Sequence, residues 1–229
     1  LYVKKADASR IYGLELEDIL SPNHINFLVH KDTLIEEHIS GIPGDTYISE
    51  HLDTISEQDK RALAKEFVKF NERCMIRLLG DMRSYNYVIV PTHDFDHVVY
   101  KIRAIDFDQQ SYEGKFNIYR PQFFKENYEM VQLVANSIQK FSIDQYKTEE
   151  RSILVKRLKS FNKRVAKLIN CMELDEISTK ENVKTLKMTI FHYTNDVNFK
   201  KSKNMGEILK NSLSFVKRNY QTENTGIFF

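Results

Sequence analysis

The spacing of hydrophobic residues changes along this 229-residue chain, and the change limits the folds open to it. Short alternating segments typical of strands occupy residues 1–4, 25–29 and 33–39. Further along, apolar side chains recur every three or four positions and predict a helix: Leu63, Phe67, Phe70, Cys74 and Leu78. Beyond residue 121 every clear pattern is helical, with apolar stripes over 124–138, 154–168 and 208–216. We therefore predict an α+β fold, with a small β-rich lobe before a larger helical lobe.

Two further features refine this arrangement. A helix over residues 8–20 lies among the first strands and ends before Pro22, because the residue preceding a proline disfavours helical backbone. Residues 41–45 contain two glycines and a proline and predict a loop. Two strands, at 87–90 and 98–105, then form a hairpin at the beginning of the helical lobe.

Composition excludes several classes of protein. The seven glycines form neither G-x-G-x-x-G nor G-x-x-x-x-G-K-[ST], which rules out the complete Rossmann and P-loop phosphate sites. With 41% hydrophobic and 29% charged residues, the chain is not expected to be disordered. No apolar run approaches the roughly 20 residues that cross a bilayer, so we expect no membrane partner. Cys74 and Cys171 lie far apart and predict reduced thiols in a cytoplasmic protein.

Charge is distributed unevenly. Residues 1–143 hold 17 Lys+Arg and 22 Asp+Glu, whereas residues 144–229 hold 17 Lys+Arg and 10 Asp+Glu. A basic helical module for nucleic acid is therefore one reading of the second half. The basic residues are interspersed with acidic ones, however, which is typical of a solvated helical surface. We expect no nucleic-acid partner, and the sequence does not indicate an oligomeric state.

Three oxygen-bearing side chains are predicted to meet at one end of the hairpin. Asp81 follows the helix that ends near Leu78, Asn86 precedes the first strand of the hairpin, and Asp106 follows its second strand. A hairpin brings the start of its first strand close to the end of its second. Carboxylate and amide oxygens suit Mg²⁺ with retained waters better than Zn²⁺. A second acidic cluster, His93 to His97, falls at the hairpin tip and predicts an exposed turn rather than a metal site.

The order Gly80-Asp81, Asn86 and Ile105-Asp106-Phe107-Asp108 resembles the catalytic and metal-binding loops of the protein-kinase-like superfamily. Its form is closest to that of aminoglycoside phosphotransferases and choline-kinase-like enzymes. Upstream, Leu1-Tyr2-Val3-Lys4 is similar to the strand with the phosphate-contacting lysine, and Glu15 lies on the next helix, where the family places the carboxylate partner of that lysine. Residues 35–41, which include Glu37, resemble the strand and linker that lead to the adenine pocket.

The resemblance implies a two-lobed, kinase-like fold and sets its boundaries. Residues 1–40 correspond to a partial N-terminal lobe with the lysine strand, a helix and two strands that lead to the linker. Residues 41–229 correspond to the helical C-terminal lobe, with the catalytic-loop hairpin at 79–108. The glycine-rich hairpin that normally precedes the lysine strand is absent, and we expect the chain to lack the beginning of such a domain.

The function implied by the resemblance is transfer of the γ-phosphoryl group of ATP to a hydroxyl acceptor, either a small molecule or a protein. Asp81 is expected to accept the hydroxyl proton, and Arg83 to meet the transferring group. Asn86 and Asp106 are expected to hold Mg²⁺.

The nucleotide side of the site is expected to contain Lys4, fixed by Glu15 against the α- and β-phosphates, and Glu37 near the adenine. Strand and helix register leave Lys5 and Glu17 as alternatives to Lys4 and Glu15.

The sequence departs from the family in ways that favour a second hypothesis. Leu79 stands where a histidine usually precedes Gly-Asp, and Asp108 replaces the glycine of D-F-G. Together with the absent glycine-rich hairpin, Leu79 is compatible with a pseudokinase, a nucleotide-binding or scaffold module without turnover. The retained Asp81, Asn86 and Asp106 favour an enzyme.

Overall fold

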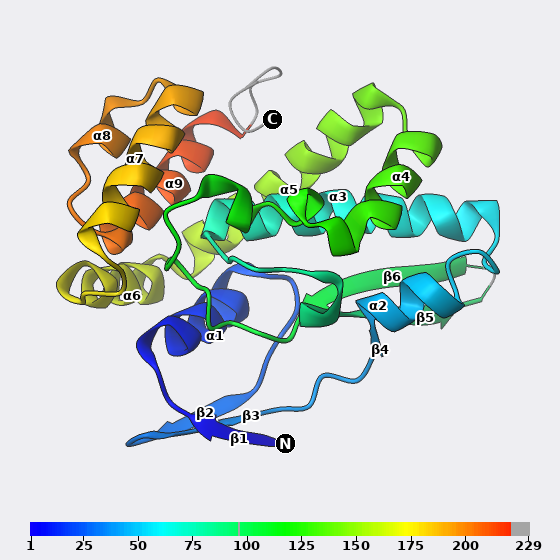
Figure 1. The fold of residues 1–229 in the computed structure, drawn as a ribbon, viewed down its shortest axis with the longest axis horizontal. Helices are drawn as coiled ribbons and strands as arrows, with labels where there is room; N and C mark the ends of the chain where they lie inside the picture. Colours follow the sequence, from blue (N-terminus) through cyan, green and yellow to red (C-terminus); the bar gives the residue numbers. More distant parts are fainter. Residues whose placement is uncertain (96, 221–229) are drawn as a thin grey trace.

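The computed structural model describes residues 1–95 and 97–220, and its fold is α+β. The first sheet is antiparallel with the strand order β1-β3-β2: β1 (Tyr2–Lys5), β2 (Phe27–His30) and β3 (Thr33–Glu36). The three strands predicted within the first forty residues are confirmed, although β3 ends at Glu36 instead of residue 39. Figure 1 shows this small sheet at one edge of the molecule, away from most of the helices.

Helices make up most of the remaining chain. They are α1 (Ala8–Leu20), α2 (Gly44–Glu50), α3 (Glu57–Arg77), α4 (Tyr128–Ser137), α5 (Lys140–Ser160), α6 (Asn162–Leu174), α7 (Lys180–Thr194), α8 (Val197–Lys201) and α9 (Met205–Asn219). Short 3₁₀ turns cover Ser84–Asn86, Phe116–Tyr119, Pro121–Phe123 and Lys125–Asn127. The stripe over 154–168 was predicted as one helix, which is wrong: the chain breaks at Phe161, where α5 ends and α6 begins, while the apolar spacing continues across the break.

The hairpin is confirmed and is longer than predicted. Strand β5 (Tyr87–Asp94) pairs with β6 (His97–Ala104), with Tyr87 opposite Ala104. A two-residue strand, β4 (Ile42–Pro43), pairs with β5 inside the segment predicted to be a loop. The loop prediction is therefore wrong for residues 42–45, because Ile42 pairs with Ile89 and α2 begins at Gly44.

Helix α1 has the predicted bounds, but the helical part of the molecule holds it in place. Asp7 caps its first turn by accepting a hydrogen bond from the Arg10 backbone N–H at 2.9 Å. The buried face of α1 packs against α5 and α6, and its Glu17 carboxylate forms a buried ion pair with Arg77 of α3. Figure 1 shows α1 between the small sheet and the helices.

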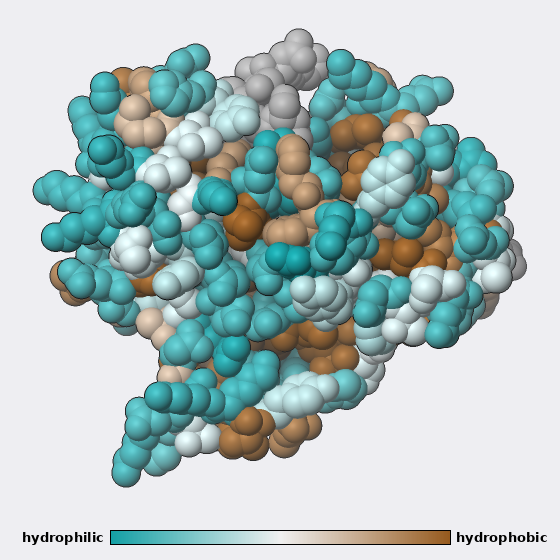
Figure 2. Space-filling model, viewed as in Figure 1, coloured by the Kyte–Doolittle hydropathy of each residue, from teal (hydrophilic) through white to brown (hydrophobic). Residues whose placement is uncertain are grey.

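Helix α3 separates two hydrophobic clusters. Its C-terminal residues Met75 and Ile76 belong to the cluster formed with α1, α5, α6, α7 and α9. Its Leu63, Phe67 and Cys74 belong to the cluster beneath the hairpin and the small sheet. Cys74 is therefore a core residue, as predicted. Among the described helices, none is long and apolar enough to span a membrane. Figure 2 shows mainly hydrophilic side chains on the visible face, with hydrophobic ones between the small sheet and the region above it.

Candidate functional site

The segment after α3 is fixed by backbone hydrogen bonds and by burial. Leu78 and Asp81 have left-handed backbone, with φ of 56° and 58°. The Gly80 N–H donates to the Gln109 carbonyl at 3.2 Å, and a Cβ on Gly80 would lie 3.0 Å from that oxygen. The Asp81 N–H donates to the Ile118 carbonyl at 3.1 Å. Leu79 is fully buried and packs in the core beneath the hairpin.

Asp81, Arg83 and Asn86 contact one another. The Asn86 amide nitrogen donates to the Asp81 carbonyl at 2.7 Å and lies 3.4 Å from its Oδ2. Arg83 Nε donates to Asp81 Oδ1 at 2.7 Å, and its Nη1 contacts Glu126 Oε1 at 3.0 Å. The hydrogen bond to Asp81 raises the pKa of Arg83. Arg83 therefore lies beside Asp81 as a fixed cation, held between two carboxylates.

The hairpin brings Asn86 and Asp106 to the same end, as predicted. The Ile105 N–H donates to the Asn86 carbonyl at 3.0 Å, so the residue before Asp106 is bonded directly to Asn86. Asn86 and Asp106 both line one pocket. We use the name loop wall for residues 79–86 and 105–108, which bring these side chains together.

Arg10 is a member of this cluster that the sequence analysis missed. Its Nη2 lies 3.5 Å from Asp106 Oδ1 and 3.8 Å from Asp108 Oδ2. Partial burial raises the pKa of Asp108, and the nearby charge of Asp106 raises it further, while Arg10 acts in the opposite direction. A single arginine early in a predicted helix carries no signal of this contact, because it depends on how α1 packs against the segment after β6.

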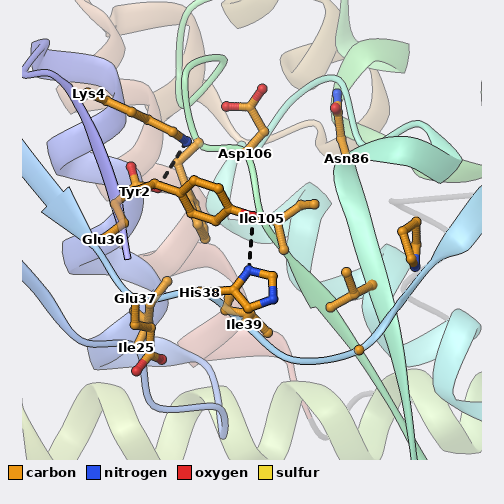
Figure 3. A pocket seen from close by; sticks show the side chains of 14 residues that line it. Tyr2, Lys4, Ile25, Glu36, Glu37, His38, Ile39, Asn86, Ile105 and Asp106 are labelled. Carbon is orange, nitrogen blue, oxygen red and sulfur yellow. Dashed lines mark hydrogen bonds and ion pairs between the residues drawn. The ribbon is translucent and has the colours of Figure 1, made fainter.

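The pocket lies between the loop wall and the small sheet and has a volume of about 290 Å³. Its other side, here called the sheet wall, consists of β1, β3 and the linker 37–41. In the upper part of Figure 3, Lys4 lies on the β1 side of the pocket, with Asp106 and Asn86 across from it; the Tyr2–His38 hydrogen bond lies below them. The lining residues are Tyr2, Lys4, Ile25, Glu36, Glu37, His38, Ile39, Gly41, Pro43, Asn86, Val88, Ile105, Asp106 and Phe107.

On the sheet wall, Lys4 and not Lys5 lines the pocket. Its Nζ contacts Glu36 Oε2 at 3.0 Å. Glu37 also lines the pocket; its Oε2 accepts a hydrogen bond from Asn26 at 2.7 Å and its Oε1 lies 3.6 Å from Arg103. The strand register left open by the sequence is thus resolved in favour of Lys4 as the pocket lysine.

The expected contact between Lys4 and Glu15 is wrong, and so is the alternative with Glu17. Glu15 Oε2 contacts Arg164 of α6 at 2.6 Å, and Glu17 pairs with the buried Arg77. Both carboxylates are turned toward the helical part because α1 packs against α5 and α6. The role of Glu15 in cofactor binding has no support from its position.

The loop wall offers oxygen ligands of the kind that a hard divalent cation takes. Asp106 supplies a carboxylate and Asn86 an amide oxygen on the same pocket, with Asp108 beside them. Among residues 1–95 and 97–220, no group of three or more His, Cys, Asp and Glu side chains is arranged to hold a metal ion.

The acidic cluster at the hairpin tip is spread around a turn. Phe95 has left-handed backbone, with φ of 47°, and is exposed. His97 Nδ1 is hydrogen-bonded to Gln58 at 3.0 Å. Asp96 lies outside the described residues.

Comparisons with known proteins identify no relative: no family model matches the chain, and neither the curated proteins nor the solved structures contain a significant match. The geometry of the pocket is therefore the basis for assigning a function.

Proposed function

We propose that this chain is a kinase-like, ATP- and Mg²⁺-dependent phosphotransferase with a nucleotide site in the pocket between the two walls. The observation that carries the proposal is the arrangement of charges. A lysine, Lys4, lies on the sheet wall, and the oxygen donors Asn86 and Asp106 lie on the loop wall of the same pocket. Triphosphate binding needs these two elements, a cation for the phosphates and oxygen ligands for their metal ion.

The pocket also has a region suited to a nucleobase. Ile25, Ile39, Val88 and Ile105 line it with apolar surface next to the linker 37–41. A flat ring system fits between such apolar side chains. We propose that the base lies against this linker and that the phosphates extend toward Lys4 and Asp106. The small sheet and the helical part then act as the two lobes of a kinase-like fold.

The proposed reaction is an in-line displacement. An acceptor hydroxyl forms a bond to the γ-phosphorus while the bond from that phosphorus to the β,γ-bridging oxygen breaks, and ADP leaves. Asp81 orients the hydroxyl and accepts its proton. Bound Mg²⁺ would neutralise charge on the phosphate oxygens, held by Asn86 and Asp106. Arg83, already aligned by Asp81 and Glu126, supplies positive charge beside the acceptor.

Turnover of ATP tests this proposal. Purified protein is incubated with ATP and Mg²⁺ and assayed for ADP, together with Asp106→Asn and Asp81→Asn variants. The wild type should form ADP only with Mg²⁺. Asp106→Asn should lose metal-dependent ATP binding, and Asp81→Asn should keep binding and lose turnover, because Asp81 acts on the acceptor. Failure of the wild type to bind ATP with Mg²⁺ would reject the proposal.

A second candidate, a nucleotide-binding module without turnover, is favoured by the ion pairs in the site. Arg83 occupies one oxygen of Asp81 at 2.7 Å, and Arg10 lies within 3.8 Å of both Asp106 and Asp108. These guanidinium groups lower the availability of the carboxylates for proton transfer and metal binding. Mg²⁺-dependent ATP binding without ADP formation, for a range of hydroxyl acceptors, would support this candidate over the enzyme.

A further inference from the structure

Glu36 is a buried carboxylate on the sheet wall, and only one of its two oxygens has a partner among the described residues. It is 4% exposed and lines the pocket. Its Oε2 contacts Lys4 Nζ at 3.0 Å, while its Oε1 is buried and has no hydrogen-bond partner among the described residues. A buried carboxylate without a partner is strongly unfavourable. Lys4 is therefore held near Glu36 by the cost of leaving that charge unpaired.

Strand pairing explains why these two side chains meet. Tyr2 pairs with Glu36 and Lys4 pairs with Leu34, so Lys4 and Glu36 are diagonal neighbours across an antiparallel pair. Alternate residues of a strand point to the same face, and diagonal neighbours on one face are within reach of long side chains. The contact is thus determined by the register of two hydrogen-bonded strands and not by the position of a helix.

The acidic residues of α1 are all occupied elsewhere. Glu15 contacts Arg164 at 2.6 Å, and Asp18 contacts the same guanidinium at 2.6 Å. Glu17 is paired with the buried Arg77. A carboxylate from α1 could reach Lys4 only by breaking one of these ion pairs.

We infer that Glu36 is the positioning residue for Lys4: it holds the ammonium group in the pocket for the nucleotide phosphates, a role that needs no movement of α1. This inference rests on the proposed function of the pocket. It also implies that the phosphate-binding cation is in place before the nucleotide arrives, because both partners belong to one small sheet. Glu36 acts through Lys4 and does not need to touch the nucleotide itself.

The test compares two ligands that differ only in their phosphates. Dissociation constants for ATP with Mg²⁺ and for adenosine are measured for wild type, Glu36→Gln and the matched control Glu15→Gln. Glu36→Gln should weaken ATP binding about tenfold, the order expected for a lost charge-assisted hydrogen bond. Adenosine binding should stay within about twofold, because it does not involve Lys4. Glu15→Gln should leave both constants unchanged.

A general disturbance of the pocket would weaken ATP and adenosine equally, and that result would overturn the inference. Unchanged ATP binding by Glu36→Gln would also overturn it. A double-mutant cycle provides a second readout: in a Lys4→Met background, Glu36→Gln should have no further effect on ATP binding if Glu36 acts only through Lys4. Full additivity of the two substitutions would contradict the proposed role.

A variant that fails to fold and a wild type that fails to bind ATP can each be distinguished from failure of the positioning role. If Glu36→Gln does not fold, Glu36→Asp keeps the charge but shortens the side chain by one methylene, and it should change the ratio of ATP to adenosine affinity in the same direction; an unchanged ratio would reject the inference. If the wild type itself fails to bind ATP with Mg²⁺, the proposed function is rejected. Wild-type binding combined with a silent Glu36→Gln rejects only the positioning role.

Discussion

The two walls of the pocket are built in different ways. In the loop wall, Leu79, Met82 and Phe107 are each at most 1% exposed, and backbone hydrogen bonds fix Gly80 and Asp81 to neighbouring segments. The sheet wall belongs to a sheet of three four-residue strands, in which Leu34 of β3 is buried and Leu28 of the neighbouring strand β2 is 61% exposed. Buried, hydrogen-bonded segments open rarely, while short exposed strands open readily. The groups proposed to bind the metal and the acceptor thus lie on firmly packed segments. Lys4 lies on the short sheet, which we expect to be displaced more easily.

The largest expected effect comes from removing a carboxylate of the loop wall. Asp106→Asn should reduce ATP turnover about 100- to 1,000-fold, because the variant loses a negatively charged oxygen ligand where charge develops. Its melting temperature should change little, since the Asp106 side chain is about one-third exposed. Steady-state kinetics and thermal denaturation measure the two quantities. A large drop in melting temperature would mean that Asp106 has a structural role instead.

Paired leucine truncations compare the loop wall with β2, the outer strand that pairs with β3 of the sheet wall. Leu79→Ala removes a fully buried side chain and should lower the free energy of unfolding by about 2–5 kcal/mol. Leu28→Ala, in the exposed β2 strand, should lower it by less than about 0.5 kcal/mol. Urea denaturation followed by circular dichroism measures both. Equal losses would show that the sheet is packed as firmly as the loop and would remove the contrast between the walls.

Hydrogen exchange measures the same contrast without substitutions. Backbone amides of β1 and β2, the two outer strands of the small sheet, should exchange faster than those in the centre of β5 and β6. ATP with Mg²⁺ should slow exchange in the small sheet more than in the hairpin, because a bound nucleotide would link this short sheet to the more firmly packed loop wall. Mass spectrometry of peptic fragments provides the comparison. Protection gained only in the hairpin would contradict a mobile sheet wall.

The smallest predicted effect concerns Asp108. Its pKa is raised by partial burial and by Asp106, so the folded protein binds this proton more tightly than the unfolded chain does. The resulting stability is present at low pH and is lost as the pH rises above the ordinary aspartate value of 3.8 toward the raised folded value. Without Mg²⁺, Asp108→Asn should therefore melt slightly higher than wild type at pH 7, with a smaller difference at pH 4. A difference independent of pH would indicate another cause.

The sequence was sufficient to predict the loop wall because its geometry is local. Asn86 and Asp106 are separated by one hairpin, and antiparallel pairing joins the ends of its strands whatever the rest of the chain does. The alternation of apolar residues likewise predicted the strands of the small sheet. These features depend on neighbours in the chain, which a single sequence contains.

The partner of Lys4 could not be predicted, because it depends on long-range packing. Glu15 and Glu36 are both acidic residues near the lysine strand. The pairing of β1 with β3 places Glu36 beside Lys4, and the packing of α1 against α5 and α6 directs Glu15 to Arg164. Arg10 was missed for the same reason. The break at Phe161 escaped prediction because the apolar spacing of α5 continues into α6. The spacing of apolar residues in one segment does not indicate how one helix or strand is oriented against another.

The central claim is that one nucleotide contacts both walls, the sheet wall through Lys4 and the loop wall through a metal ion bound at Asn86 and Asp106. Isothermal titration calorimetry of ATP, with and without Mg²⁺, on wild type and Asp106→Asn tests it most directly. We predict that Mg²⁺ strengthens ATP binding to the wild type and has little effect on Asp106→Asn. Equal strengthening by Mg²⁺ in both proteins, or no ATP binding by either, would contradict the claim.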